Sequence, residues 1–395
     1  MNKINKNYDI VIVGGGMIGA AITIGLAKIG WQILLIEEFQ PTNFYSNSKP
    51  DLRVSAINYG TKKILEQLGA WNNILNMRTN SYKILEVWEQ AYNKSHIIFD
   101  ANDIGISELG YIIENRILQL SLWNEFNKYL NLTITCPNKL ISIYKENDNW
   151  QLMLSNQEII TTKLLIGADG QNSHVRYLAG ITSKIYKYSE LCMMMTIKIK
   201  KHENITWQAF TPSGPKAFLP LFNNWACLIW YDHKTIIQQL ESMSLKEITN
   251  EIYKHFPKKL EDIEVITKKS FQFIGHHANS YIKDGLVLVG DAAHTINPIA
   301  GQGINLGYRD IKTLLNVLDD AKNKSQLFYK KNILKNFQKQ RILDNECMRI
   351  GIHAIYKIFN SNLAITKFLR QKTLSLVNYN FFIKQQLLKY ATGIK

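Results

Sequence analysis

The chain has 395 residues, of which 46% are hydrophobic and 20% are charged, and these proportions are ordinary for a folded globular protein. Such a length predicts two or three domains at roughly 100–200 residues each. The 47 Lys and Arg residues exceed the 32 Asp and Glu residues, giving a formal net charge of +15, but they are spread along the whole chain. That spread favours a solvated basic surface, so we expect no nucleic-acid partner.

Cysteine spacing and hydropathy point to a cytoplasmic protein. Cys136, Cys192, Cys227 and Cys347 are scattered without a C-x-x-C pair, which indicates neither a disulfide framework nor a zinc site. Residues 1–8 leave no room for a signal peptide, and no apolar run approaches the roughly 20 residues that span a bilayer. Any membrane contact is expected to be peripheral, at the inner membrane.

The first elements along the chain form a strand, a glycine turn, a helix and a second strand. Residues 8–13 are a β-branched run, residues 17–29 are helix-like, and residues 33–36 form an apolar run that ends at Glu37. This order is typical of a βαβ unit in a doubly wound sheet.

The turn carries a dinucleotide-binding pattern, Gly14-x-Gly16-x-x-Gly19. Its glycines permit a tight turn, close approach to a pyrophosphate, and packing of helix on strand. Glu37 lies ~20 residues further on, where a carboxylate accepts hydrogen bonds from ribose hydroxyls. The competing interpretations are a glycine turn without a ligand and, for Glu37, a solvated surface carboxylate.

Further elements follow in the order strands, a second sheet, a strand and helices. Residues 139–166 alternate as strands do, and residues 181–273 are rich in aromatic and β-branched residues, which favours a separate, mainly antiparallel sheet. A strand at residues 286–289 stops at Gly290 and Asp291, and the chain is mostly helical from Gly303 onward. We find no internal repeat, so interleaved domains are expected.

Several segments together resemble a known family. The glycine pattern and residues 51–57, 167–176, 210–220, 225–232 and 290–305 are similar to group A flavoprotein hydroxylases related to p-hydroxybenzoate hydroxylase, and within them to the ubiquinone-biosynthesis hydroxylases. The resemblance covers essentially the whole chain. It implies an α/β fold, with a Rossmann-like FAD-binding domain interleaved with a mainly antiparallel β-sheet substrate domain and a helical C-terminus.

The resemblance also implies domain boundaries. We expect the discontinuous FAD-binding domain at residues 1–80, 105–180 and 277–345. The substrate domain is expected at 81–104 and 181–276, and the C-terminal helical segment at 346–395.

Several residues match positions that contact FAD in the family. The resemblance places Asp291 on the ribityl chain. It also places the backbone N–H groups of Gly303, Ile304 and Asn305 at the pyrimidine edge, where donors stabilise charge that develops on reduction. Pro298 and Gly301 complete the lining of the flavin.

The other implied cofactor contacts belong to three further segments. Asp169 and Arg176 help to hold the cofactor and to admit nicotinamide in the family. Arg53 and Gln119 are expected to contact FAD as well, although solvation is the ordinary fate of an Arg in a polar loop. The planar fork of Arg53 suits a phosphate or ring contact.

The histidines do not indicate a metal site. His294 lies inside the flavin motif. His276 and His277 are adjacent, so on a strand their side chains face opposite ways and cannot chelate one ion together. Relatives tend to carry arginines near this point, which leaves a basic contact here in doubt.

The implied activity is FAD-dependent aromatic monooxygenation. A flavin C4a-hydroperoxide, formed from dioxygen after reduction by NAD(P)H or another donor, would hydroxylate the ring of a polyprenyl benzoquinol in ubiquinone biosynthesis. The expected substrate is 2-polyprenyl-3-methyl-6-methoxy-1,4-benzoquinol. The alternatives are a sister hydroxylase acting at another ring carbon, a flavin-dependent isoprenoid reductase, and a non-catalytic subunit of the pathway complex.

The polyprenyl tail requires apolar surface, for which the sequence offers two regions. The first is a set of residues that serve equally as sheet core, namely Phe210, Phe218, Leu221, Phe222, Trp225 and Trp230. The second lies in residues 345–395, where apolar residues (Leu369, Leu374, Leu376, Val377, Phe381, Phe382, Leu387 and Leu388) alternate with basic ones (Lys367, Arg370, Lys372, Lys384 and Lys389). This mixture fits an interfacial helix, a docking site for the pathway complex, or a segment packed on the core.

Overall fold

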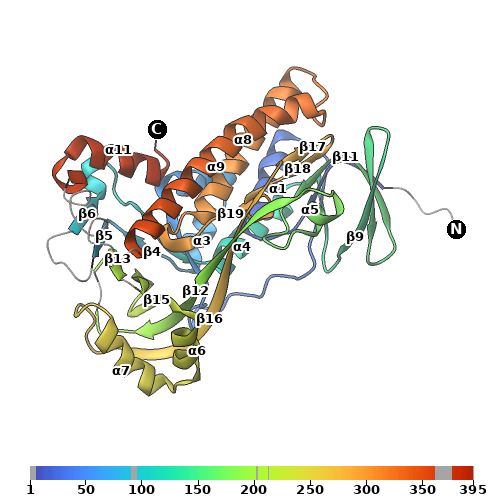
Figure 1. Ribbon diagram of the computed structural model, residues 1–395. Helices are drawn as coiled ribbons and strands as arrows, with labels where there is room; N and C mark the ends of the chain where they lie inside the picture. The colour runs from blue at the N-terminus through green and yellow to red at the C-terminus, as the bar shows by residue number, and fades with distance from the viewer. Residues whose placement is uncertain (1–5, 90–95, 202, 212, 361–375, 395) are drawn as a thin grey trace.

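The computed structural model describes residues 6–89, 96–201, 203–211, 213–360 and 376–394. Within them the strands form two large sheets and a small one. In Figure 1 the second large sheet lies between α6 (Lys234–Ser242) and α7 (Leu245–His255) at the bottom and the long helix α9 (Lys331–Asn360) above.

The first sheet contains the expected βαβ unit. Its strands are β1 (Lys6–Val13), β2 (Ile33–Ile36), β8 (Leu132–Thr135), β9 (Leu140–Glu146), β10 (Asn149–Leu154), β11 (Ile159–Gly167), β17 (Ile282–Lys283) and β18 (Leu286–Leu288). The main order is β17-β18-β11-β1-β2-β8, and β1 pairs in parallel with both β2 and β11. Helix α1 (Met17–Ile29) follows the glycine turn and ends at Gly30, whose φ of 87° suits a glycine C-cap. The predicted unit is therefore confirmed.

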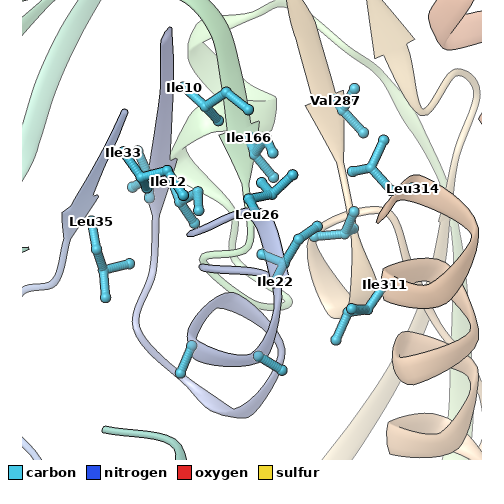
Figure 2. Packing of buried hydrophobic residues seen from close by; sticks show 14 of the residues in the cluster. Ile10, Ile12, Ile22, Leu26, Ile33, Leu35, Ile166, Val287, Ile311 and Leu314 are labelled. Atoms are coloured by element: carbon cyan, nitrogen blue, oxygen red, sulfur yellow. The ribbon is translucent and has the colours of Figure 1, made fainter. Parts of the chain in front are cut away.

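The central strands of the first sheet, β1, β2 and β18, have consecutive buried residues, so they are covered on both faces, as parallel strands usually are. Figure 2 shows Ile22 and Leu26 of α1 between Ile12 of β1 and two residues of α8 (Gly303–Asn323), Ile311 and Leu314. All five side chains are fully buried. Each such side chain contributes about 1.5–3 kcal/mol relative to its exposed state, so this layer fixes the first sheet against the helices.

The second sheet is mainly antiparallel, as expected. Its strands are β5 (Ile84–Glu89), β6 (His96–Asp100), β12 (Ser183–Lys198), β13 (Ile205–Thr211), β14 (Gly214–Pro220), β15 (Trp225–His233), β16 (Glu264–Ala278) and β19 (His294–Thr295). Alternation along β15 separates its two faces. Leu228 and Trp230 pack in the cluster with residues of α6 and α7, whereas Cys227 and Ile229 belong to the opposite cluster.

The remaining elements are a small sheet and several shorter helices and turns. The small sheet consists of β3 (Val54–Asn58), β4 (Asn80–Tyr82) and β7 (Gly110–Glu114). The shorter helices and turns are α2 (Tyr59–Leu68), α3 (Trp71–Met77), η1 (Ala101–Ile104), α4 (Asn115–Trp123), η2 (Phe126–Lys128), α5 (His174–Leu178), η3 (Gly290–Ala292) and η4 (Pro298–Ala300).

The C-terminal segment is helical where it is described, and α11 (Phe381–Thr392) docks on the core. Leu388 is buried, Lys384 pairs with Asp103 at 2.7 Å, and the Asn58 amide donates to the carbonyl of Ala391 at 2.8 Å. The expected boundary at residue 346 falls inside α9, which continues without a break. Leu369, Leu374, Lys367, Arg370 and Lys372 lie outside the described residues.

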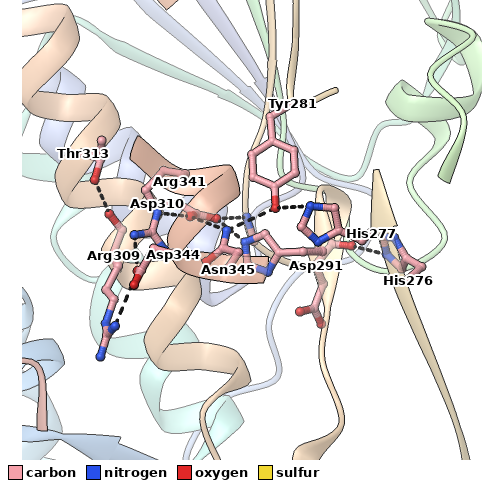
Figure 3. Close-up of polar contacts among 12 residues, drawn as sticks. His276, His277, Tyr281, Asp291, Arg309, Asp310, Thr313, Arg341, Asp344 and Asn345 are labelled. Atoms are coloured by element: carbon pink, nitrogen blue, oxygen red, sulfur yellow. Dashed lines mark hydrogen bonds and ion pairs between the residues drawn. The ribbon is translucent and has the colours of Figure 1, made fainter. Parts of the chain in front are cut away.

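A buried polar network joins α8, α9 and the loop after β18 (Figure 3). Asp310 is fully buried on α8, and its Oδ1 accepts a hydrogen bond from Arg341 at 2.7 Å. Its Oδ2 lies 2.6 Å from His294 Nε2 and accepts from the backbone N–H of Gly290 at 3.0 Å. Asn345 extends the network to the hydroxyl of Tyr281. One carboxylate thus links three separate segments.

This network predicts a large stability loss on removal of the Asp310 charge. Breaking one partner of a buried ion pair costs about 3–5 kcal/mol, because it leaves the other charge uncompensated. We expect the free energy of unfolding of Asp310→Asn, measured with urea at pH 7, to fall by about that amount.

The same variant should show a characteristic pH dependence. Burial raises the pKa of Asp310, but His294 and Arg341 outweigh that effect and hold the pKa well below its usual value. The stabilisation is therefore complete above the unfolded-state pKa of about 3.9 and is lost as the pH falls below it. Wild type and variant should converge in acid, and equal stability at pH 7 would contradict the assignment.

Candidate cofactor-binding site

The glycines of the first turn divide into two kinds. Gly14 has φ of 101°, and a Cβ there would lie 2.6 Å from the carbonyl oxygen of Ala168. A Cβ on Gly19 would lie 1.7 Å from the carbonyl oxygen of Gly14. Both glycines are thus required by the packing of the chain itself. A Cβ on Gly16 would meet nothing within 4 Å, so the N-terminus of α1 faces open space suited to an anion.

Glu37 and Gln119 both reach the glycine turn, and both contact its backbone. The Glu37 carboxylate accepts hydrogen bonds from the N–H of Gly15 and, at 2.9 Å, from that of Phe39. Gln119 and Trp123 of α4 donate to the carbonyl of Gly15 at 2.9 and 2.8 Å. Trp123 was not identified from the sequence, because nothing in its spacing connects α4 to a turn about a hundred residues earlier.

Asp169 and Arg176 organise the loop after β11. The two carboxylate oxygens of Asp169 accept hydrogen bonds from Ser173 Oγ at 2.6 Å and from the N–H of Val175 at 2.9 Å, at the start of α5. Arg176 donates to the carbonyls of Gln171 and Ala292, both at 2.8 Å. It therefore connects this loop to the loop that carries Asp291.

Asp291 follows β18 and directs its carboxylate away from the buried network, as Figure 3 shows. Gly290, the residue before it, has φ of 57°. The backbone carbonyl of Asp291 accepts a hydrogen bond from His276 Nε2 at 2.8 Å, which holds this residue in place. The Asp291 residue is exposed, and no described residue donates a hydrogen bond to its carboxylate. Desolvation by the surrounding protein nevertheless raises the pKa of the Asp291 carboxyl. The charges of His294 and Arg53 act in the opposite direction but are outweighed.

The adjacent histidines of β16 separate as expected. His276 pairs across the strands with Thr295 and His277 with His294. Burial, followed by the charge of Arg176, lowers the pKa of His276 to about 4, so the ring is neutral near pH 7 and its Nε2 carries the hydrogen. His277 contacts Tyr281, its Nε2 lying 3.1 Å from the hydroxyl. Across the described ranges, no cluster of His, Cys, Asp and Glu could hold a metal ion.

The loop that follows β19 ends at the N-terminus of α8. Pro298 begins η4, Gly301 closes it with φ of 61°, and α8 starts at Gly303. A Cβ on Gly303 would meet nothing within 4 Å. The first three N–H groups of a helix lack intrahelical acceptors, so those of Gly303, Ile304 and Asn305 remain available. The buried Oε1 of Gln302 has no partner among the described residues.

The Asn305 side chain has a structural task. It is buried, its Oδ1 accepts from the N–H of Asn58 and from Thr61 Oγ1, and its Nδ2 donates to the carbonyl of Ala56. Only its backbone is left for a ligand. Arg53, by contrast, is exposed, with its guanidinium 5.9 Å from the centre of the Phe271 ring.

Close contacts bring the loops into one site. Gly14 lies against Ala168, Ile18 of α1 lies against Gly290, and Arg176 bonds Ala292. Open space at Gly16 and Gly303, the unpaired Asp291 carboxylate and the N-termini of α1 and α8 therefore share one region. This arrangement fits an extended ligand with an anionic centre and polar groups along its length, which is the chemistry of FAD.

A cavity adjoins η4 between the second sheet and α9. It is lined by Tyr188, Glu190, Gly214, Pro215, Tyr231, Phe273, Asn297, Ile299 and Tyr356. Among the aromatic residues considered for a tail groove, Phe218 and Trp230 pack in the cluster with residues of α6 and α7, which confirms them as sheet core. Leu221, Phe222 and Trp225 lie in the opposite cluster, and Phe210 stacks on Phe359 at 3.9 Å.

Solved structures share the fold along nearly the whole chain. The p-nitrophenol 4-monooxygenase PnpA of Pseudomonas putida matches with a TM-score of 0.79 and 15% identity, covering 99% of both chains. The probable FAD-dependent monooxygenase pqsL of Pseudomonas aeruginosa matches with a TM-score of 0.79 and 17% identity, covering 93% of this chain and 99% of its own. The expected fold class is confirmed.

Sequence relatives extend along the full length. A family model described as "FAD binding domain" matches residues 7–327. The 3-demethoxyubiquinol 3-hydroxylase of Escherichia coli is 41% identical over 391 residues, which are 99% of this chain and 100% of the relative. The human mitochondrial ubiquinone biosynthesis monooxygenase COQ6 is 27% identical over 98% of this chain and 92% of its own. The chain therefore belongs to the FAD-binding-domain family, among the FAD-dependent monooxygenases of ubiquinone biosynthesis.

Proposed function

We propose that this protein is an FAD-dependent monooxygenase that hydroxylates the ring of a polyprenyl benzoquinol, 2-polyprenyl-3-methyl-6-methoxy-1,4-benzoquinol. The observation that carries the proposal is the shared site of two open glycines, Gly16 and Gly303, and the free carboxylate of Asp291. The choice of substrate follows the name of the E. coli relative, which is similar from end to end.

The chain offers a distinct group to each part of FAD. The turn formed by Gly14, Gly16 and Gly19 would hold the pyrophosphate at the N-terminus of α1, and Glu37 retains lone pairs for the adenosine ribose. Asp291 would accept hydrogen bonds from the ribityl hydroxyls. The first N–H groups of α8, those of Gly303, Ile304 and Asn305, would meet the pyrimidine edge.

Other expected contacts would act through the loops. Gln119 fixes the glycine turn, Asp169 accepts from the N–H of Val175 at the start of α5, and Arg176 joins two loops, so each would position the groups that hold FAD. Arg53, exposed beside Phe271, would meet the cofactor directly, and Pro298 and Gly301 would shape its lining.

FAD supplies the redox and oxygen-transfer chemistry when bound, with NAD(P)H or another donor and dioxygen as co-substrates. The protein must place the quinol ring beside the cofactor and keep water out. The cavity that adjoins Asn297 and Ile299 has room for about one water molecule as it stands, and it would have to widen to receive the ring. We further propose that the two large sheets are the cores of the interleaved domains described above, the first with residues 1–80, 105–180 and 277–345.

The proposed substrate predicts a specific complementation result. The gene should restore ubiquinone only in the strain that lacks hydroxylation of 2-polyprenyl-3-methyl-6-methoxy-1,4-benzoquinol, among strains that each lack one ring hydroxylase. Mass spectrometry of the quinones gives the product. Rescue of another strain would identify a sister hydroxylase, and oxygen-independent reduction of the tail would identify an isoprenoid reductase.

The proposed cofactor position predicts different outcomes for two glycines. No atom of the described residues lies within 4 Å of a Cβ built on Gly303 or on Gly351, so the chain should tolerate valine at both. Gly303→Val should slow turnover even where FAD remains bound, because the side chain enters the flavin's space. Gly351→Val, on α9, is the matched control and should behave as wild type. Full turnover with full flavin content in Gly303→Val would place the flavin elsewhere.

We also propose that α11 touches the membrane that holds the polyprenyl substrate. The described part of the chain has no helix long and apolar enough to cross a membrane. Large apolar side chains are exposed on α11 and just before it, namely Leu376, Tyr379, Phe381, Phe382 and Leu387. One expected cation, Lys384, is already paired with Asp103, so apolar insertion would contribute more than charge. A contact with a pathway complex would use the same surface.

Vesicle flotation tests the membrane proposal. The full chain should float with phosphatidylethanolamine vesicles that contain phosphatidylglycerol, and Phe381→Ser combined with Phe382→Ser should reduce flotation. Both side chains are exposed, so FAD binding should remain, whereas Leu130→Ser controls for loss of an exposed apolar residue. Equal flotation of all three proteins, or of none, would remove α11 from membrane binding.

A further inference from the structure

The cavity beside η4 contains one carboxylate. Among the described residues that line it, Glu190 of β12 is the sole acidic group. Glu190 is 9% exposed, and its Oε2 accepts a hydrogen bond of 2.5 Å from the hydroxyl of Tyr356 on α9. The Tyr356 ring meets that of Tyr188 edge to face at 5.4 Å. The carboxylate is therefore held in place at the wall of the cavity.

The cavity is lined by residues of the loop before α8 and by residues of the second sheet. Asn297 and Ile299 come from the loop that leads to Gly301 and Gly303, whereas Tyr188, Glu190 and Tyr231 come from the second sheet. Once the cavity has widened to admit it, a ring bound here would lie between the loop assigned to the flavin and the Glu190 carboxylate, which is 2.5 Å from the hydroxyl of Tyr356.

We propose that Glu190 is the catalytic base that removes a proton from a ring hydroxyl of the quinol, an assignment that rests on the proposed function. In this step the O–H bond of the quinol breaks, the proton moves to Glu190, and the electron pair stays on the ring oxygen. The resulting phenolate raises electron density at the ring carbons ortho and para to it. Those are the positions at which an electrophilic oxygen is accepted.

The other groups around Glu190 are poorly suited to this role. Burial raises the pKa of Tyr231 well above its usual value and also raises that of Tyr188, so both hydroxyls keep their protons. His233 is the cross-strand neighbour of Glu190 but is exposed. From α9, Tyr356 donates to Glu190, His353 stacks on Tyr356, and Arg349 lies over Tyr186 and pairs with Glu346.

The test measures product per flavin in a single turnover. Full-length, FAD-loaded enzyme is reduced with one equivalent of dithionite. It is then mixed with aerobic buffer that contains an analogue of the proposed quinol substrate with a short polyprenyl tail. Wild type should give hydroxylated product at pH 7. Glu190→Gln keeps an oxygen that can accept from Tyr356, but ring deprotonation should slow by roughly a hundredfold or more, so oxygen leaves mainly as hydrogen peroxide.

Raising the pH should rescue the variant. The yield of Glu190→Gln should recover as the pH approaches about 10, the ordinary pKa of a phenol, because the quinol then ionises unaided. Tyr356→Phe retains the carboxylate and should give at least a third of the wild-type yield at pH 8.

The outcomes separate the two proposals. No product from wild type would overturn the proposed function itself. Product from wild type and an equal yield from Glu190→Gln at pH 7 would overturn only the assignment of Glu190, leaving its contact with Tyr356 as a clamp between β12 and α9. If Glu190→Gln fails to retain FAD, the yield of Tyr356→Phe decides, and a yield below a third of wild type at pH 8 would contradict the base.

Discussion

One buried carboxylate, Asp310, holds the loop on which the site depends. Its two oxygens meet Arg341 of α9, His294 of β19 and the N–H of Gly290, all within hydrogen-bond distance. Gly290 is thereby fixed from inside, and His276 fixes the carbonyl of Asp291 from the neighbouring strand. With both of these backbone groups occupied, the Asp291 carboxylate is free to face outward.

In the rest of the site, too, some groups hold the backbone in place and others remain open to a ligand. Gly14 and Gly19 are required by close backbone contacts, while Gly16 and Gly303 leave space that the chain does not use. Glu37 and Gln119 hold the glycine turn through Gly15. The Asn305 side chain holds the loop before α8 through the carbonyl of Gly301 and bonds to the N–H of Asn58. Such support is what lets a few groups keep a productive geometry.

Local pattern predicted the first elements well. β1, α1 and β2 follow the expected order because β-branched runs and a glycine turn determine them within a short stretch of chain. The network around Asp310 could not be predicted, since an Asp within an amphipathic helix is ordinarily solvated and its partners lie in distant segments. The pair of Glu190 and Tyr356 is separated by 166 residues and arises only when α9 packs on the second sheet.

Sequence resemblance pointed to residues that the fold brings close together, but it did not distinguish their tasks. Gln119, Asp169 and Asn305 all lie at the site, yet their side chains bond to protein groups. A residue in such a motif can touch the ligand or can hold the loop that does. Hydrogen-bond partners in the folded chain separate the two.

The most direct test of the account is the affinity of deflavinated protein for FAD in Asp291→Ala. A lost charge-assisted hydrogen bond costs about 1.5–3 kcal/mol, so Kd should rise about 10- to 150-fold. Asp320→Ala, which removes an exposed carboxylate from the far end of α8, should bind FAD as wild type does. An unchanged Kd in Asp291→Ala would show that its free carboxylate does not hold the cofactor.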